Sequence, residues 1–175
     1  MKKLIIALLL TPFLSLSQSV EWMSFEEAME ANKNEPKKIL IDVYTDWCGW
    51  CKKMDKDTYA NPVVAKFINE NYYPIKLDAE TKDTIRYDTL VFVNPNTGRR
   101  SSHQLAVSLM SGKMSYPTTL IMNEEVKIIQ KIPGYLDAAT IEPLLHYFYE
   151  DMHTQMPYDD YKAKFSSSLP EQTKP

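Results

Sequence analysis

The sequence predicts an α/β domain whose central sheet carries helices on both faces. Residues 38–44, KILIDVY, form a compact β-branched run of the kind found in buried strands, and a second strand is expected within 72–80. Two further runs, 118–122 and 126–132, flank a polar turn and predict a β-hairpin. Helical patterns lie between these strands, and this alternation indicates the fold class.

Helix-start signals mark the first half of the chain. Ser24 and Glu27 match a capping box, and the helix that they begin should end before Pro36. Another helix should continue from the second cysteine through 51–60. Asn61, which is followed by proline, is then expected to cap the helix that leads to the second strand.

The second half of the chain is less regular. Residues 81–103 are interpreted as an insertion, in which 89–93 predicts a short strand. A helix within 103–112 should follow, and Asp137 should cap the last helix of the domain. The apolar face of that last helix comprises Ile141, Leu144, Leu145 and Phe148.

The first residues have the pattern of a secretory signal peptide. Two lysines precede an apolar run at 4–16, and small residues follow that suit cleavage near residue 19. The alternative is a membrane anchor, but the run is short and Thr11 and Pro12 interrupt it. We therefore predict a signal peptide at 1–19 and an exported, periplasmic protein.

The remaining chain is predicted to form one domain with a tail. The domain should cover 20–150, and the polar residues 151–175 are expected to fray. Apolar residues make up 44% of the 175, which is sufficient for a core. The net charge of −3 at pH 7 falls to −5 once the leader is removed, so no nucleic-acid partner is expected.

The only two cysteines of the chain, Cys48 and Cys51, are separated by two residues. A structural clamp, a zinc site, a haem anchor and a redox couple are the candidates. A disulfide across so short a loop contributes about 2 kcal/mol at best. Zinc needs four ligands, and the three histidines have no spacing that completes a site. A c-type haem needs histidine after the second cysteine, where Lys52 stands.

A redox couple fits the position of the pair, between a strand and a helix. At a helix N-terminus, Cys48 faces unpaired N–H groups and the positive end of the dipole, which stabilise a thiolate. Its pKa should therefore be lowered, leaving a sulfur that is ionised and reachable at neutral pH. Cys51 lies one turn further in and should be less exposed. Cys48 is thus expected to attack a substrate disulfide and Cys51 to resolve the mixed disulfide.

The stretch DVYTDWCGWCKK, residues 42–53, resembles the active-site segment of the thioredoxin superfamily. The similarity extends to an acid at Asp42, to SYPTTLIM at 115–122, which matches the cis-proline segment, and to Gly134 after the hairpin. The resemblance covers about 20–150, and it suggests exported thioredoxin-like proteins of Gram-negative bacteria as relatives. The resemblance implies a thioredoxin-like fold: a central mixed sheet flanked by helices, with an insertion before the cis-proline segment.

The resemblance also implies roles for single residues. Asp42 would be buried and relay a proton to or from Cys51, the alternative being a carboxylate that faces water. Trp47 would cover one side of the dithiol, or pack in the core. Pro117 would be cis and lie against the disulfide, and Tyr116 would touch substrate unless it is only an exposed loop aromatic.

Trp50 is also assigned to substrate binding. Together with Gly49 it departs from the Gly-Pro pair of thioredoxins, so the redox potential of the family does not carry over.

The predicted function is that of a periplasmic thiol–disulfide oxidoreductase. A reductant is favoured over an oxidant, because the chain lacks the large helical insertion of dedicated periplasmic oxidases. The expected partners are thiols or disulfides of exported proteins and a membrane-linked electron donor, with no metal and no cofactor beyond the cysteine pair. The alternative is a thioredoxin-fold binding or chaperone module that does not need its CxxC and docks partners through 81–103 and 146–161.

Overall fold

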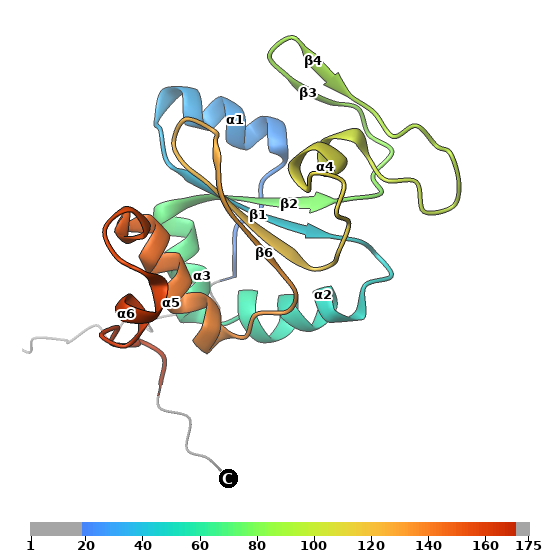
Figure 1. Ribbon diagram of the computed structural model, residues 1–175. Coiled ribbons are helices and arrows are strands. Elements are labelled where there is room, and N and C mark those ends of the chain that lie inside the picture. The colour runs from blue at the N-terminus through green and yellow to red at the C-terminus, as the bar shows by residue number, and fades with distance from the viewer. Residues whose placement is uncertain (1–18, 171–175) are drawn as a thin grey trace, which may run out of the picture.

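A computed structural model describes residues 19–170 and has the predicted α/β architecture (Figure 1). The sheet order is β2–β1–β5–β6, with strand bounds that follow the sequence patterns. They are β1 Lys38–Tyr44, β2 Tyr72–Asp78, β5 Thr118–Met122 and β6 Ile128–Pro133. Strand β1 pairs in parallel with β2 and antiparallel with β5, which is antiparallel to β6. The sheet is therefore mixed. The predicted signal peptide lies outside the described residues except for its last position.

Helices cover both faces of this sheet (Figure 1). Helices α1 (Phe25–Asn34) and α4 (Gln104–Leu109) contribute to the core on one face. Helices α2 (Gly49–Met54), α3 (Pro62–Asn71) and α5 (Ala138–Tyr149) contribute to the core on the other. Between residues 19 and 170, no helix combines the length and the apolar character that a membrane span requires.

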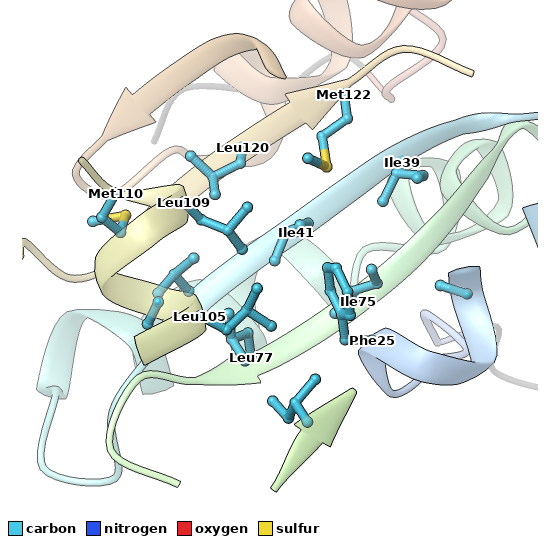
Figure 2. Close-up of a cluster of buried hydrophobic side chains, with 14 of the residues drawn as sticks. Phe25, Ile39, Ile41, Ile75, Leu77, Leu105, Leu109, Met110, Leu120 and Met122 are labelled. Carbon is cyan, nitrogen blue, oxygen red and sulfur yellow. The ribbon is translucent and has the colours of Figure 1, made fainter. Parts of the chain in front are cut away.

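The alternation of side chains along β1 divides the core into its two halves. Ile39 and Ile41 belong to the cluster beneath α1 and α4, as Figure 2 shows, whereas Leu40 belongs to the cluster beneath α2, α3 and α5. Because successive strand residues point to opposite faces, Asp42 shares the face of Leu40. The strand thus delivers one carboxylate to the layer that contains α2.

The predicted caps form as expected. Ser24 and Glu27 make a complete capping box, and the helix ends at Asn34, before the proline. Asn61 accepts from two N–H groups of α3, and Asp137 accepts from the Thr140 N–H at 2.8 Å. Helix α2 continues into a π-helical turn, Asp55–Tyr59.

The segment interpreted as an insertion has structure of its own. Strands β3 (Ile85–Tyr87) and β4 (Leu90–Phe92) form a separate antiparallel pair. Strand β4 agrees with the short strand predicted at 89–93, whereas β3 was not predicted. Residues 93–103, the β4–α4 loop, then lead into α4. His103 caps that helix by accepting the Leu105 N–H.

Residues 151–170 do not fray, contrary to expectation. They form a 3₁₀ turn, Met152–Thr154, and helix α6, Tyr158–Lys162. Glu142 of α5 is buried and accepts from Ser167 Oγ and from the Ser168 N–H. Partly buried side chains of the tail pack against the core beneath α5, namely Met152, Tyr158, Tyr161 and Leu169. Two contributions offset the conformational entropy that is lost when this segment is ordered. They are the apolar area that these side chains bury and the two hydrogen bonds that Glu142 accepts.

Leucine-to-alanine substitutions should separate core positions from exposed ones. Leu120 on β5 is fully buried in the cluster beneath α1 and α4 (Figure 2), so Leu120→Ala should lower the free energy of unfolding by about 2–5 kcal/mol. Leu90 on β4 is 54% exposed, and Leu90→Ala should change it by about 0.5 kcal/mol or less. Urea unfolding of both variants measures the two values, and equal losses would contradict the assigned core.

Candidate active site

Cys48 and Cys51 form a disulfide at the junction of β1 and α2, where the sequence placed them. Cys48 is the N-cap residue of α2, and its Sγ accepts the Cys51 N–H at 3.1 Å. The Cys48 N–H donates to the Thr45 carbonyl at 3.0 Å, which closes the turn after the strand. The sulfur at position 48 therefore occupies the electropositive end of the helix.

Cys48 is more exposed than Cys51, as predicted, but both residues are buried. Cys48 is 5% exposed and Cys51 1%. The expected reachable residue at position 48 is thus nearly buried in the disulfide form, because its sulfur is bonded to Cys51 and turned toward the first N–H groups of the helix. The lowered thiolate pKa concerns the reduced form and stays a prediction.

Asp42 lies buried beneath the α2 layer, only 1% exposed, and does not face water. Burial raises the pKa of its carboxyl from 3.8 to about 6, and the Lys76 ammonium opposes that rise. One carboxylate oxygen is 2.5 Å from Lys76 Nζ. The other, Oδ1, has no hydrogen-bond partner among residues 19–170. The group therefore titrates near neutrality with one oxygen unused by the protein.

Lys76 and Asp55 complete this charged cluster, and sequence analysis missed both. Lys76 is the register partner of Asp42 across the parallel β1–β2 pair, and its Nζ also forms an ion pair with Asp55 at the start of the π-helical turn. Although burial alone would lower it, the two carboxylates raise the pKa of Lys76. The signal was a single lysine inside the otherwise uncharged stretch YYPIKL of β2.

Aromatic rings enclose the same ammonium group. Lys76 Nζ lies 5.0 Å from the ring centroid of Trp22, 4.9 Å from that of Tyr44 and 5.5 Å from that of Tyr59. These cation–π contacts hold the lysine in place over the sheet face that carries Asp42.

The segment that resembles a cis-proline loop has that conformation. The Tyr116–Pro117 peptide is cis, and the Pro117 carbonyl accepts the Gly134 N–H at 2.8 Å. Gly134 has a φ of +100°, which favours glycine at this position. Tyr116 is half-buried, and its ring meets the edge of Trp47 with 5.9 Å between centroids. The proline segment therefore adjoins the residue that precedes Cys48.

One tryptophan precedes Cys48, another lies between the two cysteines, and both are largely exposed. Trp47 is 48% exposed and Trp50 59%, so neither is a core residue. The Trp47 Nε1–H donates to the Glu80 carboxylate at 3.1 Å, and the Trp50 ring lies beside Tyr135 with 5.6 Å between centroids. Both indoles are thus held at the surface with polar or aromatic support.

Fold and site together define a thioredoxin-like thiol–disulfide protein. A family model, Thioredox_DsbH, described as a protein of unknown function (DUF255), matches residues 10–143. The match spans most of the chain, which therefore belongs to this family.

Curated relatives match shorter stretches. An uncharacterized protein of Archaeoglobus fulgidus is 30% identical over 80 residues, 45% of this chain and 63% of that protein. An uncharacterized protein of Caenorhabditis elegans is also 30% identical over 80 residues, 11% of its length. The thiol:disulfide interchange protein DsbD of Photorhabdus laumondii is 25% identical over 128 residues, 72% of this chain and 19% of DsbD. The chain thus spans less than two thirds of each of these relatives.

Solved structures share the fold at low sequence identity. A DsbH oxidoreductase has a TM-score of 0.56 at 18% identity, covering 85% of this chain and 96% of its own. A putative disulphide-isomerase from Bacteroides thetaiotaomicron has a TM-score of 0.52 at 23% identity, covering 80% of this chain and 98% of its own. These likenesses confirm the thioredoxin fold.

The raised pKa of Asp42 predicts a pH-dependent gain in stability on its removal. A raised folded-state pKa favours folding while the carboxyl is protonated, and that contribution is lost as the pH rises from about 4 through about 6. Asp42→Asn should therefore raise the free energy of unfolding at pH 7 by about 1–3 kcal/mol and have little effect below pH 4.

Urea unfolding at both pH values measures this difference. Asp46→Asn, at an exposed position, is the control and should change the free energy by about 0.5 kcal/mol or less. Destabilisation by Asp42→Asn at pH 7 would show that the Lys76 ion pair outweighs the cost of burying the carboxylate.

Proposed function

We propose that this protein is an exported thiol–disulfide oxidoreductase that reduces or exchanges disulfides of other exported proteins. The observation that carries the proposal is the Cys48–Cys51 disulfide at the start of α2, beside a cis-proline segment. The two cysteines are the whole thiol content of the chain, and a loop this short contributes little stability. Exchange chemistry explains the pair better than a structural clamp does.

The reaction starts from the reduced dithiol. The Cys48 thiolate attacks one sulfur of a substrate disulfide, which forms a mixed disulfide and releases the other substrate sulfur as a thiolate. The Cys51 thiolate then attacks Cys48 Sγ and releases the second substrate thiolate. The substrate gains two electrons and two protons, and the protein is left with the Cys48–Cys51 disulfide. A dithiol donor must reduce that disulfide before the next cycle.

Asp42 serves as the proton acceptor for Cys51 in this scheme. With a pKa of about 6 it is largely ionised at pH 7, and its Oδ1 has no competing partner within the described chain. Lys76 positions the carboxylate through the other oxygen. Trp47, Trp50, Tyr116 and Pro117 form the substrate-facing surroundings of the disulfide.

The place of action is proposed to be the periplasm, reached through the signal peptide at 1–19. The relationship to a thiol:disulfide interchange protein supports exchange partners of the same chemical kind. A membrane-linked electron donor is proposed as the source of electrons. The proposed direction of exchange is reduction of the substrate disulfide.

Cysteine substitutions test the proposal directly. The reduced protein should catalyse insulin reduction by dithiothreitol, and Cys48→Ser should abolish that activity. Cys51→Ser should accumulate mixed disulfides with exported proteins, because the resolving thiolate is missing. Diagonal electrophoresis detects these adducts, and mass spectrometry identifies the partner proteins. Lys56→Ser, at an exposed position of the π-helical turn, is the control that should keep activity.

The same variants distinguish an enzyme from a binding module. Full biological activity of the Cys48→Ser, Cys51→Ser double variant would assign the function to binding and overturn the proposed exchange reaction.

The proton role of Asp42 has its own kinetic test. Asp42→Asn should slow resolution of a mixed disulfide made with Cys48 by about 10²-fold near pH 7, because Cys51 loses its base. Stopped-flow release of the substrate thiol measures the rate. The deficit should shrink at high pH, where the Cys51 thiol ionises unaided, and a deficit independent of pH would point to a structural effect.

A further inference from the structure

The β4–α4 loop is fastened to the end of β2, close to the disulfide. The Asn94 amide, which is 6% exposed, donates to the carbonyls of Glu80 at 3.1 Å and Ser101 at 2.6 Å. The His103 N–H donates to the Ala79 carbonyl at 2.7 Å. Figure 1 shows this loop at the same end of the sheet as the turn between β1 and α2. Hydrogen bonds therefore tie both ends of the loop to the segment that follows β2 and to each other.

The loop places a cation on the tryptophan that precedes Cys48. The guanidinium carbon of Arg100 lies 4.2 Å from the ring centroid of Trp47. That indole is also held by its N–H bond to Glu80 and by the edge contact with Tyr116. Arg100 thus stacks on a side chain that is fixed from two other directions, and the stacking fixes the arginine in turn.

The Arg100 guanidinium has no anionic partner within the described chain, although it lies over the Trp47 ring. Arg99 and Arg100 are both exposed, and neither guanidinium forms an ion pair or hydrogen bond with residues 19–170. The nearby Glu80 carboxylate directs both oxygens to the Trp47 N–H instead. A stacked guanidinium keeps its N–H edge free, and that edge matches a carboxylate.

We propose that Arg100 is a specificity-determining residue that binds a carboxylate next to the reacting disulfide of the substrate. The β4–α4 loop then forms one wall of the substrate site and selects disulfides in acidic peptide segments. This inference rests on the proposed exchange function and adds its substrate class. A passive loop would not need its cation held against the indole beside Cys48.

Two peptides of the same sequence test the proposal. Each carries one intramolecular disulfide, with Asp beside the reactive cysteine in one peptide and Asn in the other. The reduced protein should react with the Asp peptide about two- to fivefold faster at low ionic strength, the range expected for one exposed charge pair. Salt should remove the preference. Quenched time points resolved by chromatography give both second-order rate constants.

Variants of the two neighbouring arginines assign the effect. Arg100→Gln should bring the ratio of the two rate constants close to one, and Arg100→Lys should keep part of the preference because it keeps the charge. Arg99→Gln is the matched control and should retain the preference. Circular dichroism checks that each variant is folded.

The possible outcomes separate this inference from the proposed function. Equal rates in the parent protein, or a preference that survives in Arg100→Gln, would overturn the role of Arg100 and leave the exchange function standing. Failure to react with either peptide would reject the exchange function, and the inference would fall with it.

Discussion

The alternation of side chains along β1 is the constraint on which the rest of the structure depends. This strand is paired on both edges and covered on both faces, so its odd and even positions enter separate cores. A slip of one residue would exchange these faces and move Asp42 into the apolar cluster beneath α1 and α4. In the observed register, Lys76 lies opposite Asp42, and the strand ends where the turn to Cys48 begins. One register therefore sets the core, the buried charge and the position of the disulfide.

The surroundings of the buried Asp42 carboxyl do not fully replace the hydration that it loses. Burial raises the pKa of Asp42 to about 6, which shows that the Lys76 ion pair only partly offsets the loss of hydration. A leucine at the same place would extend the apolar cluster to which Leu40 belongs. A buried carboxyl whose pKa is raised to about 6 is typical of a site kept for chemistry.

The site has two parts: a base, formed by residues of β1, β2 and α2, and a rim, formed by loops that include the β4–α4 loop. The base consists of strand and helix residues, whose positions follow from the shared thioredoxin fold. The rim is supplied by loops, and the β4–α4 loop reaches Trp47 through Arg100 while its backbone is anchored by Asn94. Proteins with this fold can therefore share the exchange chemistry and differ in the disulfides that they select, because loops vary while the scaffold that positions them is constant.

The sequence by itself determined the four strands of the main sheet, the caps at Ser24, Asn61 and Asp137, and the position of Cys48 at a helix start. The reason is that β-branched runs, capping patterns and the CxxC spacing are local signals. Resemblance to a family added the buried acid and the cis-proline. Only the tertiary structure decided that Lys76 neutralises the acid from a position 34 residues away, that Arg100 covers Trp47, and that the tail packs on α5. These contacts depend on strand register and on how loops close across the sheet, and no short stretch of sequence encodes either.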